Sequence, residues 1–436
     1  MAARPLDREI LRLAGPAFVT LLAEPVYLLA DTAVVGHLGT PQLAGLAVAS
    51  TILLTANSLF IFLAYGTTAA VARLIGAGDR KAAIHQAVQG VWLGAFSGIA
   101  LAAVLGLFSA PLVHLLGARD DVATNALLYL RISLVGLPFL MVVMAGTGFL
   151  RGVQDTRTPL LVAVGTATLN LVLELVLVFG LDRGIGASAL GTVIAQVVGA
   201  GFYVAAVVRG SRVEQVELRP HPSTQRRLIR VGRDLAVRTA SLRLALLALT
   251  AVAARISSVA LASHQISFEI WSFLAMGLDA LAIAGQSMIG HRLGSGSAAN
   301  ARTAGRRLLV LGVLAGVASG VVVAVLSPWL PRVFTRDQAV IDLTRSLLLV
   351  VAVLQPVASV AFVLDGVLIG AGDQRFLARA MALATVGMVL ALAPVLPLDL
   401  GIGWAWAGFG VFMVIRAVTL LLRFRADRWT VTGASV

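Results

Sequence analysis

Long apolar runs alternate with short polar breaks along the whole chain. Twelve of these runs can cross a membrane as helices, since about 20 residues span the hydrocarbon core. We expect the twelve helices at residues 12–36, 43–74, 84–109, 123–150, 158–181, 185–208, 231–256, 260–292, 305–330, 339–369, 376–397 and 402–424. Several are longer than a straight crossing requires, so we expect tilt or bending.

One polar stretch interrupts this pattern near the middle of the chain. Gly210–Gln225 contains two prolines, mixed charges and no apolar periodicity, which indicates a linker. We therefore divide the chain into a first half of six helices (1–209), a cytoplasmic linker (210–228) and a second half of six helices (229–436).

The two halves repeat each other at a shift of 218 residues. The shift superimposes Pro138 on Pro356, and it brings Gly148, Gly152, Asp155 and Arg157 onto Gly366, Gly370, Asp373 and Arg375. Six is an even number of helices, so both halves enter the membrane from the same side and the repeat is parallel. We predict an all-α membrane protein in which two similar six-helix bundles, an N-lobe and a C-lobe, surround a central cleft. That architecture is typical of alternating-access transporters.

The composition indicates a membrane protein, and the distribution of basic residues predicts its orientation in the membrane. Of the 436 residues, 59% are hydrophobic and 13% are charged, whereas soluble domains carry about 25% charged residues. The net charge of +13 comes from arginines in short gaps between apolar runs, which argues against a nucleic-acid partner. With a cytoplasmic N-terminus, 24 basic residues fall on the cytoplasmic side and five on the other. We expect a monomer among the lipids of the inner (plasma) membrane, with both termini cytoplasmic.

Acidic and polar side chains gather at one depth in the first half. Asp31 lies five residues inside Gly36, or about 8 Å deep, where a carboxylate costs ~2.5–3.5 kcal/mol at the helix centre. Glu174 and Thr192 fall at a similar depth, and Asn170 lies one turn from Glu174. These four oxygen-bearing side chains suit a Na⁺ site or a shared proton. The alternative is that Asp31 and Glu174 are unrelated acids facing different cavities.

The second half holds two acids inside predicted helices, Asp279 and Asp365, whose repeat mates are not acidic. We consider a substrate contact or a second proton site, against an inter-helix hydrogen bond. Arg238 falls in the first turns of the helix at 231–256, where snorkelling to the membrane surface is the default expectation.

No cofactor is expected. The Gly76–Gly78 and Gly294–Gly296 turns lack the Gly-Lys-Ser/Thr of a nucleotide loop, and the six histidines show no metal-ligand spacing.

These landmarks together resemble the multidrug and toxic compound extrusion (MATE) family over essentially the whole chain. The DTAVVGHLG and DALAIAGQ forms are most similar to its bacterial DinF branch. The resemblance is carried by Pro25–Gly39, Gly148–Pro159, Asn170–Glu174, His264-Gln265, Asp279–Gly294 and Asp365–Asp373.

The resemblance implies an antiporter that exports organic, often cationic, compounds in exchange for H⁺ or Na⁺. In the DinF branch, an N-lobe site couples the cation through a first-helix Asp and a fifth-helix Asn-x-x-x-Asp. Asp31 and Asn170 match this pattern, and Glu174 stands where Asp is usual. The same resemblance implies that Tyr27, Tyr129 and Thr192 are polar partners of this cation site. Another branch has a C-lobe glutamate in the seventh helix, and Ala236–Ile256 contains none.

Our hypothesis from the sequence is cation-driven export of a small organic substrate. The cation neutralises Asp31 and Glu174, the first helix bends at Pro16 or Pro25, and the N-lobe expels its substrate outward. The nearest alternative is a lipid-precursor flippase of the same superfamily, which is expected to have fourteen helices and a strongly cationic cavity. A membrane enzyme acting on lipids is the alternative of another class, and it requires a clustered nucleophile, metal site or His/Asp pair that the sequence does not show.

Overall fold

The structure is a computed structural model that describes residues 3–180 and 184–434. These residues form helices joined by turns, without a strand. Within them, twelve helical segments are long and apolar enough to cross a membrane. The prediction of an all-α membrane protein with twelve transmembrane helices is therefore confirmed.

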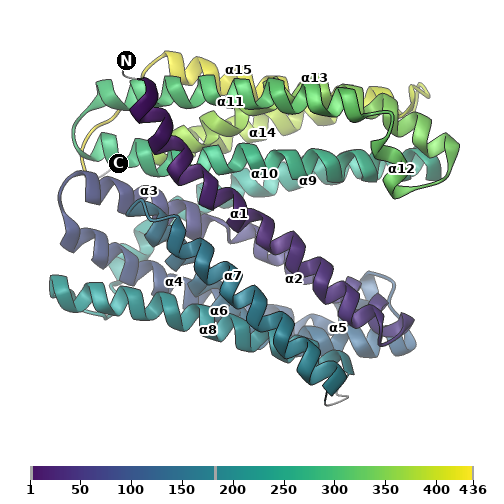
Figure 1. Cartoon of the computed structure of the whole chain (residues 1–436), viewed down its shortest axis with the longest axis horizontal. Coiled ribbons are helices and arrows are strands. Elements are labelled where there is room, and N and C mark those ends of the chain that lie inside the picture. Colours follow the sequence, from purple (N-terminus) through teal and green to yellow (C-terminus); the bar gives the residue numbers. More distant parts are fainter. Residues whose placement is uncertain (1–2, 181–183, 435–436) are drawn as a thin grey trace. The chain divides into compact units, whose positions relative to one another are not determined.

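The helices are shown in Figure 1. Those of the first half are α1 (Ala3–Gly36), α2 (Thr40–Leu59), α3 (Phe62–Gly76), α4 (Arg80–Leu107), α5 (Ser109–Leu115), α6 (Asp120–Gly152), α7 (Arg157–Glu174), the π-helix η1 (Leu175–Gly180) and α8 (Gly184–Glu214). Those of the second half are α9 (Pro222–Ile256), α10 (Ser258–Gly294), α11 (Ala298–Leu326), α12 (Leu330–Phe334), α13 (Gln338–Gly370), α14 (Gln374–Leu392) and α15 (Gly401–Arg425).

Two predicted helices are not uniform α-helices. The run at 43–74 breaks at Phe60 and Ile61 into α2 and α3, although neither proline nor glycine marks the break. The run at 158–181 changes from α7 to the π-helix η1 directly after Glu174. Short π-helical turns often occur at functional sites because they shift the direction of nearby side chains.

Helix also occupies much of the stretch predicted as a linker. α8 continues to Glu214 and α9 begins at Pro222, so only seven residues separate them. This short segment is held on α4, where Trp92 Nε1 donates to the Leu218 carbonyl (2.6 Å) and Gln89 Nε2 donates to the Arg219 carbonyl (2.9 Å).

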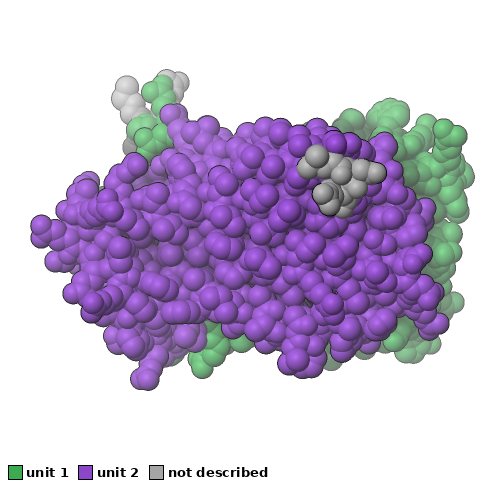
Figure 2. Space-filling model, turned by 90° about the horizontal axis from the view of Figure 1, so that it is seen from below, with its two compact units in different colours: residues 1–18, 233–436 green, residues 19–232 purple. Residues whose placement is uncertain are grey.

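The chain forms two compact units (Figure 2). We call residues 19–232 the N-unit, and residues 1–18 together with 233–436 the C-unit. The first residues of the chain pack with the second half through ion pairs. Arg307 binds both carboxylate oxygens of Asp7 (2.5 and 2.7 Å), and Arg292 binds Glu9 (2.9 Å). α1 and α9 each begin in one unit and end in the other.

The repeated glycines explain how each unit packs. In the N-unit, α6 contacts α3, α4 and α8, and in the C-unit its repeat mate α13 contacts α10, α11 and α15. A Cβ at Gly148 of α6 would lie 2.5 Å from the Ala64 carbonyl oxygen of α3, and one at Gly366 of α13 would collide with the backbone of Ala282 on α10. The same small residue therefore permits close helix packing at corresponding places in both halves.

Candidate functional site

Five buried or half-buried side chains from four helices converge in the N-unit. They are Asp31 on α1, Tyr129 on α6, Glu174 at the end of α7, and Ser188 and Thr192 on α8. Asp31 is 2% exposed, and Glu174 and Ser188 are both 0% exposed. Ser188 and Thr192 are four residues apart on α8, so both project from the same face of that helix.

A serine hydroxyl lies between the two acids. Ser188 Oγ is 2.6 Å from Asp31 Oδ1 and 3.1 Å from Glu174 Oε1. A hydroxyl has one hydrogen to donate. The hydroxyl either shares this hydrogen between both carboxylates, or donates it to one acid and accepts a proton from the other when that acid is protonated. The other oxygen of Asp31, Oδ2, accepts a hydrogen bond from the Tyr129 hydroxyl (3.2 Å).

Two further hydroxyls extend this cluster. Thr192 Oγ1 donates to the carbonyl oxygen of Ser188 (3.2 Å), and it is also hydrogen-bonded to the Tyr27 hydroxyl (2.9 Å). Since Thr192 gives its hydrogen to the carbonyl, Tyr27 is the donor in the second bond. We call Asp31, Tyr129, Glu174, Ser188, Thr192 and Tyr27 the acid cluster.

Several polar atoms at this site have no hydrogen-bond partner among the described residues. These atoms are Glu174 Oε2 and both side-chain atoms of Asn170, which is 3% exposed. Buried polar groups are normally satisfied by protein or by bound water and ions. Unsatisfied oxygens next to two carboxyl groups fit a small cation or water as their missing partner.

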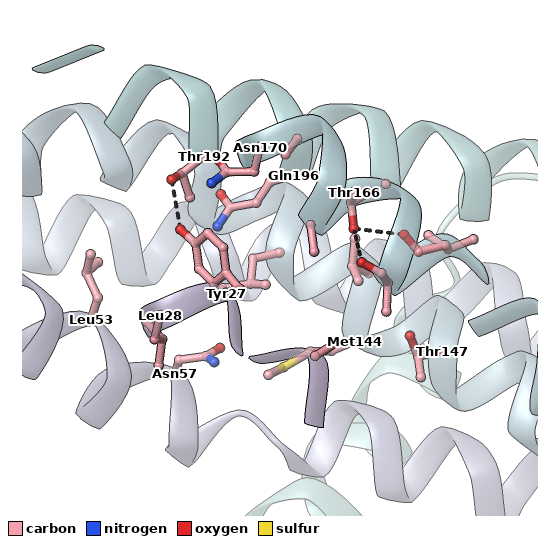
Figure 3. A pocket seen from close by; sticks show the side chains of 18 of the residues that line it. Tyr27, Leu28, Leu53, Asn57, Met144, Thr147, Thr166, Asn170, Thr192 and Gln196 are labelled. Atoms are coloured by element: carbon pink, nitrogen blue, oxygen red, sulfur yellow. Dashed lines mark hydrogen bonds between the residues drawn. The ribbon is translucent and has the colours of Figure 1, made fainter. Parts of the chain in front are cut away.

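A cavity of about 350 Å³ adjoins the acid cluster (Figure 3). Its wall includes Tyr27, Tyr129, Asn170 and Thr192, and the Tyr27 hydroxyl points at Thr192 in the figure. The rest of the lining is aliphatic or neutral and polar, and no described residue of the wall carries a charged side chain. Asn57 Oδ1 and Gln196 Oε1, also on the wall, are buried acceptors without a partner in the described chain. The cavity thus offers an apolar surface with unused hydrogen-bond acceptors.

The two prolines expected to bend the first helix lie within α1, which runs without a break from Ala3 to Gly36. Pro25 has no N–H, so the carbonyl of Leu21 lacks its usual helical donor. This weak point is less than two turns from Asp31.

The acids of the C-unit are in a different environment. Asp365 is 4% exposed and pairs through Oδ2 with both Arg238 (2.7 Å) and Arg416. The Arg416 guanidinium also stacks over the rings of Phe362 (5.3 Å) and Phe412 (5.5 Å), and it interacts electrostatically with Asp279. The expectation that Arg238 snorkels to the membrane surface is wrong, because its side chain is buried against Asp365.

Sequence reasoning missed Ser188 and Arg416. Serine in a membrane helix is common as a packing residue, so nothing distinguishes Ser188 until its contacts are known. Arg416 falls within the predicted helix at 402–424, but its partner lies 51 residues away on another helix, where sequence spacing gives no signal.

Comparisons with known proteins agree with the fold and its repeat. A family model described as MatE matches residues 16–176 and again residues 235–395, as expected for a repeated half. The chain is 33% identical to Protein DETOXIFICATION 44, chloroplastic, of Arabidopsis thaliana, over 89% of this chain and 76% of that protein. It is 30% identical to DNA damage-inducible protein F of Escherichia coli, over 88% and 85% of the two chains. The crystal structure of the Vibrio cholerae MATE transporter VcmN in the bent form has the same fold, with a TM-score of 0.89, 21% identity and coverage of 98% and 97%.

Proposed function

Because the chain belongs to the MATE family of membrane transporters, we propose that it is a secondary antiporter that exports small organic compounds in exchange for a cation. Members of this family are transporters and not enzymes. The observation that carries the proposal is the cavity of about 350 Å³ beside two buried acids: Tyr129 of its wall donates to Asp31, and Asp31 shares the Ser188 hydroxyl with Glu174. Substrate and cation can then act on the same helices and bias one conformational equilibrium.

We assign cation coupling to Asp31 and Glu174, with Asn170, Thr192, Tyr27 and Tyr129 as polar partners. No lysine or arginine pairs with either acid among the described residues. Two acids without a resident positive charge, buried at 2% and 0% exposure, favour a bound cation.

We propose H⁺ as that cation. Both oxygens of Asp31 already accept hydrogen bonds, from Ser188 and Tyr129, and a proton on one of the two acids would give Ser188 a full hydrogen bond to each of them. A sodium ion would have to use the remaining oxygens of Glu174 and Asn170 and displace some of these bonds.

The cavity supports an amphipathic organic cation as the substrate. Aliphatic side chains of its wall suit a hydrocarbon or aromatic body. The unused acceptors on Asn57 and Gln196 suit N–H donors, and the neighbouring acids attract positive charge. The described wall has no cationic side chain, which favours drug export over the flippase alternative.

For the transport cycle we propose that proton binding lets α1 bend at Pro16 or Pro25 and close the cavity. We propose that Asp279 and Asp365 neutralise the charges of Arg238 and Arg416. In this proposal they do not form a second proton site. We also propose that both termini are cytoplasmic and that the protein lies in the plasma membrane, as the positive-inside rule predicts.

The experiment is transport of a fluorescent organic cation in proteoliposomes containing the full chain. A pH gradient and a Na⁺ gradient are imposed separately. We expect substrate movement with the pH gradient alone. Movement with the Na⁺ gradient alone would contradict proton coupling, and movement with neither gradient would contradict antiport.

A further inference from the structure

A groove on the surface of the N-unit contains an arginine without a countercharge. It runs between α6 and α8, and its lining includes Thr124, Leu128, Arg131, Val135, Leu190 and Val193. Val193 is buried and forms the floor, whereas Leu128, Val135 and Leu190 are 46–62% exposed along the sides. Apart from Thr124 and Arg131, every side chain that lines the groove is aliphatic.

The charge of Arg131 is unbalanced within the described chain. Its side chain is exposed, and no carboxylate there lies within ion-pair distance of it, in contrast to Arg238 and Arg416. Arg131 lies 11 residues into the transmembrane helix α6, or about 16 Å from its start. A cation at this depth requires an anionic partner or a path to the membrane surface.

The direction of the side chain supports a partner near the membrane surface. Side chains in an α-helix lean towards the helix N-terminus. Arg131 therefore leans towards Thr124, two turns earlier, and both polar groups come to one end of the groove. The repeat mate of Arg131 in the C-unit is Leu349, so the arginine is not part of the repeated framework.

We propose that this groove binds one anionic phospholipid, with its phosphate on Arg131 and Thr124 and an acyl chain along Leu128, Val135 and Leu190. From Thr124 to Val135 the groove extends about 16 Å, close to half of the ~30 Å hydrocarbon core that one leaflet's acyl chains fill. The guanidinium recognises a phosphate by paired charged hydrogen bonds, and the aliphatic lining matches the chain.

The groove lies on the other side of α6 and α8, which are two of the four helices that carry the acid cluster. Tyr129 precedes Arg131 by two residues and is buried, and Thr192 directly precedes Val193. A lipid in the groove would therefore hold α6 and α8 together beside the acid cluster.

The test is native mass spectrometry of the purified full chain, titrated with phosphatidylglycerol. We expect one phosphatidylglycerol to stay bound to the wild type. Arg131→Gln should bind it about tenfold more weakly, the factor for one lost charged hydrogen bond. Leu128→Trp keeps the arginine but fills the groove, and it should weaken binding as well. Arg345→Gln, which removes another exposed arginine within a transmembrane helix, is the matched control and should bind like the wild type.

The proposal would be overturned by equal binding to the wild type and Arg131→Gln, by an equal loss in Arg345→Gln, or by equal retention of phosphatidylcholine. Competition by inorganic phosphate as effective as that of the lipid would also overturn it, since the acyl chain would then contribute nothing. None of these measurements depends on transport, so they stand apart from the proposed function.

Discussion

The two units each bury acidic side chains but balance them in opposite ways. In the N-unit, Asp31 and Glu174 share the Ser188 hydroxyl and have no basic partner among the described residues. In the C-unit, Asp365 is paired with Arg238 and Arg416, and Asp279 interacts with Arg416. A buried charge needs a compensating charge. The C-unit has its positive charges built in, whereas the N-unit must acquire its own from solution, and an exchangeable cation is what an antiporter uses.

The largest effect is expected from breaking the balance in the C-unit. Asp365→Asn leaves two buried arginines without their carboxylate, and we expect a loss of about 3–5 kcal/mol in unfolding free energy. The measurement is thermal unfolding in detergent. Asp342→Asn, which changes an exposed acid of the same helix, is the control and should change little. Unchanged stability of Asp365→Asn would show that the arginines do not depend on this acid.

The corresponding change in the N-unit should affect transport and leave stability nearly intact. Asp31→Asn removes one of the two acids that bind the cation, and we expect cation-driven transport to fall about 100-fold. Transport of a fluorescent organic cation in proteoliposomes measures this, with unfolding temperature as the control. If Asp31→Asn transports at the wild-type rate, the N-unit acids are not the coupling site.

The close helix packing at corresponding glycines occurs in both units, so the same substitution should lower the unfolding free energy equally in each. Gly148→Ala and Gly366→Ala each insert a methyl group into a backbone contact between helices, and we expect each to cost about 1–3 kcal/mol. Gly201→Ala is the matched control, because its new methyl group meets open space and should stabilise the helix by up to about 1 kcal/mol. Unfolding temperatures compare the three variants. A cost in only one unit would mean that the repeat does not preserve packing.

The smallest effect is expected from the hydroxyl that joins the two acids. Ser188→Ala removes one hydrogen bond to Asp31, and we expect proton-driven transport to fall about 2- to 10-fold. Ser188→Thr retains the hydroxyl and should recover most of the rate. The comparison is made at a fixed pH gradient. A loss as large as that of Asp31→Asn would make Ser188 as essential as the acid itself.

The sequence was sufficient for the fold because a membrane restricts what a chain can do. Each crossing needs a continuous apolar run, so the twelve helices follow from run lengths, and the repeated glycines identify α6 and α13 as corresponding helices. No proline or glycine lies at the break at Phe60 or at the change from α7 to the π-helix after Glu174, so periodicity did not predict them.

The chemistry of the site was predictable only in part. Depth along the helices brought Asp31, Glu174, Thr192 and Asn170 to one level, and their assigned role remains a prediction. Depth along a helix does not show which side chains contact each other on helices that are distant in the sequence. Ser188 is one of many small polar residues, and the pairing of Asp365 with Arg238 and Arg416 depends on helix rotations that a single sequence does not specify.

Proton release by the purified protein tests the central claim most directly. A transported organic cation is added to the full chain in weakly buffered detergent solution without Na⁺, and the change in pH is recorded. If substrate and proton compete, the wild type and Asp342→Asn should each release roughly one proton per chain. Asp31→Asn should release none. Equal release from the wild type and Asp31→Asn would contradict an exchangeable proton at Asp31 and Glu174.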